Sequence, residues 1–372
     1  MATYNGIFLR SSLNQQNTVP RPGAQSNSPD IIPYGIFTPP SDPQQYFRDT
    51  YEQDVGKALE ANKTNFIYLR GKNYSTQEID DKGETRPHLY WTKASLLTYP
   101  NKWTELTETS SKQPVSLKAG ANGGIGVISE PLIWRPDNID NDHYCMIASV
   151  PSPGYDNSIP NTLQISDFAG WVAKSGGVAW RNVTVINSKT LTLTGEKLFY
   201  EQGTEAGLME FTIKCLNVPI NTKVSFAAGV SGPIPPIQLK ETPVSTYPSF
   251  NTGVECQVPA GYVSEIYFNL EAPQGVTELP DAKVTIQATY TVSAESELYA
   301  YAMTRSELGI PSPDEAYAVI WRSLLLQKKN KLEPQHEQYL EQLTDLYKPH
   351  LAARADRKIV VGQNNYDWRK LK

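Results

Sequence analysis

The sequence predicts a mainly β protein, built as two tandem antiparallel β-sandwich domains followed by a short C-terminal helical hairpin. Three observations lead to this prediction. Proline (28), glycine (24) and tyrosine (21) are plentiful among the 372 residues, as turn-rich β structure requires. Short strand-like runs separated by turn residues recur in two series before residue 305. Beyond residue 306 the spacing of apolar residues changes to that of helices.

The first domain is predicted over residues 27–190, after an irregular N-terminal arm of residues 1–26. Around this boundary the chain is too rich in proline for a helix or a central strand. Five strand-like runs follow, namely NFIYLRGKNYS, HLYWTKASLL, GGIGVISEPLIWRP, HYCMIASV and GVAWRNVTVIN. The fourth run alternates, which predicts two faces: Tyr144, Met146, Ala148 and Val150 on one, and His143, Cys145 and Ile147 on the other.

The second domain is predicted over residues 191–305, from a second series of strand-like runs. They are LTLTGEKLFYEQ, AGLMEFTIKCLNVP, KVSFAAGV, GVECQVPAGYVSEIYFNLEAP and AKVTIQATYTVSAESELYAYAMT. A long proline-rich stretch, VSGPIPPIQLKETPVSTYPSFN, interrupts the series and indicates a loop or an edge strand. We see no helical pattern between the strands, and this favours antiparallel sheets over a parallel sheet with crossover helices.

The C-terminal region, residues 306–372, is predicted to be helical. Ser312, Pro313 and Glu315 form a capping box at the start of a helix. One apolar stripe consists of Tyr317, Ile320, Trp321 and Leu324, and a second, after Pro334, of Tyr339, Leu340, Leu343, Leu346 and Tyr347. Short amphipathic helices are only marginally stable in water, so these apolar stripes must pack against other side chains. We expect the first stripe to pack on the second sandwich or on the other helix, and the alternative is an arm that binds a partner.

Charge and hydropathy exclude some classes of protein. The net charge of -5 and the pI of about 5.6 argue against a general nucleic-acid binder, which needs a basic surface. The sequence contains no apolar run long enough for a membrane-spanning helix, and its first residues do not resemble a secretory signal. We therefore expect a cytoplasmic protein without a transmembrane segment, for which non-classical export stays open.

Three cysteines, Cys145, Cys215 and Cys256, cannot all pair within one chain, and they form no CxxC motif. The prediction is that they are reduced and mostly buried, as in a reducing compartment. A Cys145–Cys215 bridge across a sandwich is the alternative.

Residues that could carry chemistry are few. The four histidines, His88, His143, His336 and His350, show neither HExxH nor zinc-site spacing. His143 and Cys145 lie on one face of a strand, yet a catalytic pair needs a third group to orient the imidazole, and nothing nearby supplies one. Asp80–Asp81 and Asp140–Asp142 are interpreted as turn residues, with calcium binding as the alternative. We predict no catalytic residue, no cofactor and no metal.

Aromatic residues allow a second interpretation of the first domain. Five tryptophans fall within it, namely Trp91, Trp103, Trp134, Trp171 and Trp180. A sandwich core needs large side chains to fill the space between its sheets, which favours packing. If these rings were exposed together, they would instead form a platform for a sugar.

Four stretches together resemble a bacterial immunoglobulin-like module: NSPDIIPYG, NFIYLRGKNYS, EPLIWRPDNIDNDHYCMIASV and GVAWRNVTVIN. The resemblance covers roughly residues 1–190 and implies that Trp134 and the Cys145 strand belong to the core framework. Such modules bind or space rather than catalyse. The whole chain also resembles the MakC/MakD family, the accessory proteins of a tripartite pore-forming cytotoxin, the motility-associated killing factor. No single motif carries this second likeness.

Three functional hypotheses follow. The first is a non-enzymatic accessory protein that acts through protein contacts, which the second resemblance places in the production, stability or export of bacterial toxin subunits. Its partners would be toxin subunits or a paralogous accessory protein. The second is a carbohydrate-binding or adhesive module, and the third is an enzyme that uses His143 and Cys145. The lack of any convergent catalytic set favours the first.

Overall fold

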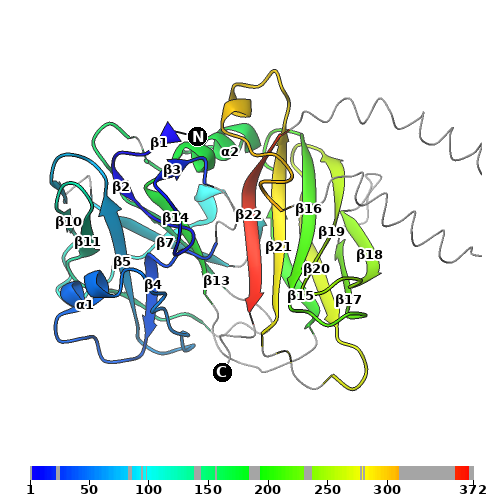
Figure 1. The fold of residues 1–372 in the computed structure, drawn as a ribbon, viewed down its shortest axis with the longest axis horizontal. Coiled ribbons are helices and arrows are strands. Elements are labelled where there is room, and N and C mark those ends of the chain that lie inside the picture. Colours follow the sequence, from blue (N-terminus) through cyan, green and yellow to red (C-terminus); the bar gives the residue numbers. More distant parts are fainter. Residues whose placement is uncertain are drawn as a thin grey trace, which may run out of the picture.

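The computed structural model describes residues 2–21, 26–82, 86–93, 95–97, 99–137, 144–155, 157–183, 193–229, 237–276, 279, 281–309 and 357–367. These residues fold into a mainly β protein with several antiparallel sheets, as the sequence predicts. Figure 1 shows a first half that contains the N-terminus beside a second half of longer strands. The predicted helical hairpin falls on residues 310–356, outside the described residues.

The first half contains two main sheets that enclose one core. The seven-stranded sheet comprises β12 (Leu132–Trp134), β5 (Asn65–Asn73), β11 (Gly124–Ile128), β10 (Leu117–Ala119) and β6 (Ile79–Asp81), with β2 (Ile7–Phe8) and β4 (Ile31–Gly35) also paired to β5. The four-stranded sheet comprises β14 (Val178–Val183), β13 (Tyr144–Ser149), β7 (His88–Lys93) and β9 (Thr104–Glu105). Trp134 of one sheet meets Tyr144 of the other edge to face, with ring centroids 4.8 Å apart.

The second half also packs two sheets face to face. One comprises β18 (Gln238–Pro243), β17 (Lys223–Ala228), β20 (Val263–Glu271), β15 (Leu193–Glu201) and β8 (Ser95–Leu97). The other comprises β19 (Ser249–Val258), β16 (Gly207–Leu216), β21 (Lys283–Val292) and β22 (Arg357–Asp367). Tyr200 and Phe211 join them across the core, with ring centroids 5.1 Å apart. Along β20, alternate residues from Ser264 to Leu270 are buried.

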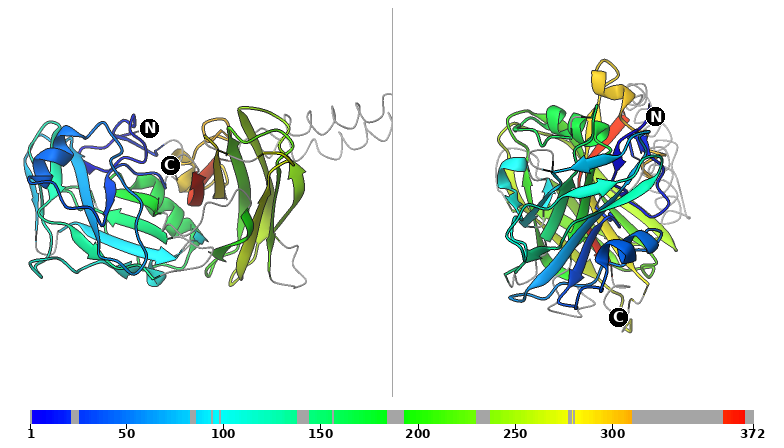
Figure 2. Two further views of the ribbon diagram at one scale, coloured as in Figure 1. Left: turned by 90° about the horizontal axis from the view of Figure 1, so that it is seen from below. Right: turned by 90° about the vertical axis from the view of Figure 1, so that its left-hand side faces the viewer.

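Two short helices accompany the sheets. α1 (Pro43–Asp49) begins with proline at its first turn, and the Asp42 carboxylate accepts a hydrogen bond from the Gln45 N–H. α2 (Ile165–Lys174) lies between the two halves and buries Phe168 and Val172 (Figure 2). The prediction of no helix between the strands is wrong at α2, whose apolar face is short and is interrupted in the sequence by the polar residues Ser166 and Asp167. Single 3-10 turns occur at η2 (Pro100–Lys102) and η3 (Glu297–Ala300).

The N-terminal segment is not the irregular arm predicted for residues 1–26. It forms β1 (Ala2–Thr3) and β3 (Thr18–Val19), which pair with each other, and β2, which pairs with β5. Its run GIFL is buried completely from Ile7 to Leu9. Because this run has only four residues between polar neighbours, it shows no period in the sequence, although burial of its side chains fixes the segment to the sheet.

The helical prediction for residues 306–372 is wrong at its end, because residues 357–367 form β22. This strand pairs with β21 along its whole length and supplies the buried residues Ile359, Val360 and Val361. A second departure concerns β8, which lies within the predicted first domain but pairs with β15 of the second half, in parallel. Non-local strand pairing of this kind has no local signature in a sequence.

Candidate functional site

We call the region where β8, α2 and β22 join the two halves the seam, because three separate chain segments meet there. β8, α2 and β22 lie against one another, and β22 runs through the middle of the molecule (Figures 1 and 2). A Cβ atom on Gly362 of β22 would lie 1.3 Å from the carbonyl oxygen of Leu96 in β8. Glycine is therefore required where these two backbones touch.

Strand β13 brings its two predicted faces to two different environments. Tyr144, Met146, Ala148 and Val150 join the core of the first half, whereas Cys145 and Ile147 face the seam beside Trp171 and Trp180. The alternation read from HYCMIASV is confirmed for these residues. Every residue of β13 is buried, since α2 and the second half cover the face that would otherwise meet solvent.

A chain of hydrogen bonds crosses the seam from the thiol of Cys145. The thiol donates to Asn182 Oδ1 at 3.3 Å, and Asn182 Nδ2 donates to Asn364 Oδ1 at 2.6 Å. Next to Asn364 on β22, Asn365 Nδ2 donates to Ser26 Oγ at 2.6 Å. The amides of β22 thus tie the C-terminal strand to the first half. The thiol's hydrogen-bond partner is an amide, which cannot act as a base toward it.

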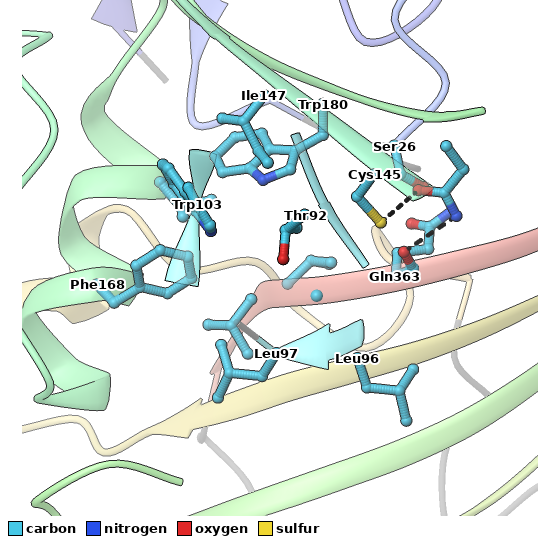
Figure 3. Close-up of a pocket in the computed structure, with 15 residues that line it drawn as sticks. Ser26, Thr92, Leu96, Leu97, Trp103, Cys145, Ile147, Phe168, Trp180 and Gln363 are labelled. Carbon is cyan, nitrogen blue, oxygen red and sulfur yellow. Dashed lines mark hydrogen bonds between the residues drawn. The ribbon is translucent and has the colours of Figure 1, made fainter. Parts of the chain in front are cut away.

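A cavity of about 40 Å³ lies at the centre of the seam. Cys145, Trp180, Leu96 and Gln363 are among its lining residues, and Figure 3 shows them around the backbone of β22. Binding sites for small molecules enclose roughly 300–1,000 Å³, whereas one water molecule needs only a small part of the observed volume. The cavity has room for a water or two between packed side chains, but not for a substrate.

Most of the histidine and carboxylate candidates fall on residues that the structure does not describe. His143 and the Asp140–Asp142 pair lie outside the described residues, as do His336 and His350. His88 Nδ1 lies 2.7 Å from Glu105 Oε1 in a partly exposed group with Arg86. Within the described ranges, no three His, Cys, Asp or Glu side chains gather as a metal would require. Asp80 is exposed and Asp81 is buried, because neighbouring residues of β6 face opposite sides of the sheet.

All three cysteines are free, so the Cys145–Cys215 bridge is not formed. Cys145 and Cys215 are buried and Cys256 is half-buried, as predicted in outline. Burial raises the pKa of the Cys215 thiol to about 12, and burial together with Glu255 raises that of Cys256 to about 11. Since the thiolate is the reactive form, neither thiol is activated as a nucleophile at neutral pH.

The five tryptophans do not form an exposed platform. Trp134 is 5% exposed, and the other four are half-buried, packed against the cores and the seam. Exposed apolar side chains gather elsewhere, beside α1. Ile36, Phe37 and Tyr46 are 43%, 50% and 36% exposed. We call these three residues the Phe37 patch.

Ring and cation contacts hold the Phe37 patch together. Phe37 and Tyr46 each meet Tyr34, with centroids 6.5 and 6.4 Å from its ring, and Lys57 Nζ lies 3.9 Å from the centroids of both Tyr34 and Phe37. The patch follows Gly35, whose φ of 71° turns the chain out of β4. Its signal in the sequence is the apolar pair Ile36–Phe37, which stands between a glycine and two prolines.

Comparisons with known proteins leave the family open. No family model matches the chain, and no curated protein matches it. One solved structure, of manganese lipoxygenase of Gaeumannomyces graminis with part of zonadhesin of Komagataella pastoris, is 8% identical with a TM-score of 0.17, covering 70% of this chain and 88% of that one. The Enterococcus faecalis protein ACE, described as binding its ligands by the collagen Hug model, is 8% identical with a TM-score of 0.17, covering 64% and 88%. Similarities this weak carry no argument about fold or function. In the described part of the chain, neither helix has the length and apolar character needed to cross a membrane.

Proposed function

We propose that this protein is a non-enzymatic interaction protein, built on two immunoglobulin-like sandwiches, and that the Phe37 patch is its contact surface for a protein partner. The observation that carries the proposal is the exposure of Phe37 and Tyr46, whose rings both contact Tyr34, beside the exposed Ile36. Aromatic residues are enriched at the centres of protein interfaces, where they contribute most of the binding free energy. Lys57 adds a cation at the rim of the patch, which favours a partner with an acidic margin.

The proposed partners are the α-helical subunits of a bacterial pore-forming toxin, with the protein supporting their production, stability or export. The support for this part is the sequence resemblance to the MakC/MakD family. An apolar groove or helix face on such a subunit would suit the patch, because amphipathic helices present apolar anchors at helical spacing. A cytoplasmic site of action is part of the same proposal.

The test is binding of purified toxin subunits to the full chain by calorimetry. Phe37→Ser should weaken binding by about 10- to 100-fold, as expected for an interface anchor. The matched control is Val263→Ser, which changes an apolar residue of similar exposure, 46%, in the second half. Cys145→Ser should leave binding unchanged. If the wild-type chain binds no subunit, the toxin role is wrong; if Phe37→Ser binds as well as wild type, the patch is not the contact surface.

The alternative function is carbohydrate binding, which the same exposed rings favour, because sugars stack on aromatic faces. A panel of soluble β-linked glucose and N-acetylglucosamine oligosaccharides distinguishes the two. Saturable binding of one oligosaccharide, lost in Phe37→Ser and retained in Val263→Ser, would replace the protein partner with a sugar.

A further inference from the structure

The second half has two sheet edges that face away from the seam. β8 and β22 are the edge strands on the seam side, where α2 and the first half cover them. β18 and β19 are the edge strands on the opposite side, at the right of Figure 1. An unpaired edge offers N–H and C=O groups to any strand that approaches, so the chemistry of each edge matters.

β18 carries the features that protect an edge. Lys240 and Glu241 are exposed along it, and Pro243 ends it without an N–H. Its pairing with β17 also shifts in register between Val224 and Phe226, which twists the strand away from a flat edge. A second strand could not extend this sheet without meeting charges and an irregular ladder.

β19 has none of these features. It pairs with β16 over ten consecutive residues with no shift in register, and it contains no lysine, arginine or proline. Among the described residues, its outer edge has no backbone partner. Its one charged side chain is Glu255, whose carboxylate is paired with Arg305 at 3.2 Å and with Lys358 at 2.5 Å. The edge is therefore long, regular and without unbalanced charge.

We propose that β19 pairs antiparallel with β19 of a second copy, which joins two four-stranded sheets into one across a two-fold axis. In an antiparallel pair, directly opposed side chains lie on the same face of the sheet. The two-fold axis between the strands must therefore lie level with one residue of each strand, and not between two consecutive residues. An axis at Val254 places the half-buried Val254 side chains against each other and Glu255 opposite Gly253. Nothing in this register opposes two like charges. The contrast between the protected edge and the unprotected one points to a copy of the same chain, because the pairing is self-complementary in charge and length. This inference is independent of the Phe37 patch.

The experiment is sedimentation equilibrium of the full chain over a range of concentrations. Wild type should form a dimer. Val254→Lys sets two ammonium groups opposite each other and should raise the dimer dissociation constant at least about tenfold. Val254→Thr, which keeps the branched shape without the charge, should stay close to wild type. A wild-type monomer at all concentrations, or a dimer that Val254→Lys does not weaken, overturns the proposal.

A cross-linking variant decides the matter even if Val254→Lys folds poorly. In the proposed register Thr252 lies opposite Cys256 of the second copy. Thr252→Cys should therefore form a disulfide-linked dimer on mild oxidation. Gln257→Cys, on the other face of the strand, should not. Equal cross-linking of both variants, or of neither, contradicts the pairing.

Discussion

At the scale of single residues, the buried charges are the most informative feature, because each must have a partner or destabilise the fold. Asp30 is fully buried and pairs with Arg10 at 2.7 Å and Arg70 at 3.2 Å, which fixes the N-terminal segment to β5. Lys358, 1% exposed, pairs with Glu210 at 2.9 Å and with Glu255. Both networks attach a terminal segment to the body of the protein.

We expect Lys358→Met to lower the free energy of unfolding by about 3 kcal/mol, since the buried carboxylate of Glu210 loses its ammonium partner and keeps the guanidinium of Arg305 at 2.8 Å. Methionine keeps most of the side-chain volume, so the loss reports the charge. Urea denaturation measures it. Lys197→Met is the matched control, because Lys197 and Glu265 are both about half exposed, and it should change stability by less than about 1 kcal/mol. Equal effects in the two variants would contradict the role given to Lys358.

Asp81 differs from these paired residues, because burial favours the neutral form of its carboxyl group. It is 4% exposed, and its Oδ2 atom has no hydrogen-bond partner among the described residues. Burial, and secondarily Asp80, raises its pKa to about 7. The folded protein then binds this proton more tightly than the unfolded chain, so stability falls as pH rises from about 4 to 7.

Asp81→Asn removes this ionisation and should therefore be more stable than wild type at pH 8, by about 1–3 kcal/mol. The difference should shrink as the pH is lowered toward 4, where Asp81 is protonated in the folded protein and about half protonated in the unfolded chain. Melting temperatures of both proteins between pH 4 and 8 give the comparison, with Asp80→Asn as the exposed control. A constant difference across that range would show that Asp81 does not titrate in it.

At the scale of elements, the features that depend on neighbouring residues could be predicted from the sequence, and those that depend on contacts between distant segments could not. The alternation of β13 could be predicted because its successive residues face two different apolar environments. The place of β22 could not be predicted, because KIVVGQNNYD is too short and too polar to show a period. Its Asn364 and Asn365 side chains bond to Asn182 and Ser26, which lie far along the chain. The seam site was hidden for the same reason, since three distant segments build it.

β22 should be indispensable to the fold. A chain that ends at residue 356 loses an eleven-residue strand and exposes the edge of β21 with the buried core beneath it. We expect this chain to aggregate or to melt at a markedly lower temperature. A chain that ends at residue 367 keeps the strand and should behave as wild type. Light scattering and calorimetry on both chains decide this.

The residues that precede β22 can be tested without removing it. Met303 and Lys358 exchange two backbone hydrogen bonds, of 2.9 and 2.7 Å, so the chain returns near its point of departure. A flexible linker of about 10 glycine and serine residues in place of residues 310–356 tests this segment, and packing of the first predicted stripe on the second sandwich would make the replacement lower the melting temperature. A large loss of stability would mean that the predicted apolar stripes pack on the fold; loss of partner binding alone would make them an arm.

At the scale of the whole molecule, the core of the second half includes side chains from before residue 190, which separates this protein from a pair of independent domains on a linker. Leu96, Leu97 and Phe168, from before residue 190, lie in the same buried cluster as Phe211 and Ile286, from after it. β22, from the end of the chain, covers the seam and bonds to the first half. The boundary predicted at residue 190 therefore cuts through packed side chains.

Fragments 1–190 and 191–372 should consequently fail to fold separately, although a chain of either length can in principle form a domain. The first would expose the apolar residues of β8 and α2, and the second would lack the strand that pairs with β15. Co-expression should restore soluble protein, because the missing contacts are then supplied between chains. The intact protein should unfold in one calorimetric transition, with equal calorimetric and van't Hoff enthalpies. Two resolved transitions, or a soluble 1–190 fragment with a cooperative melt of its own, would show instead that the seam joins two independent sandwiches.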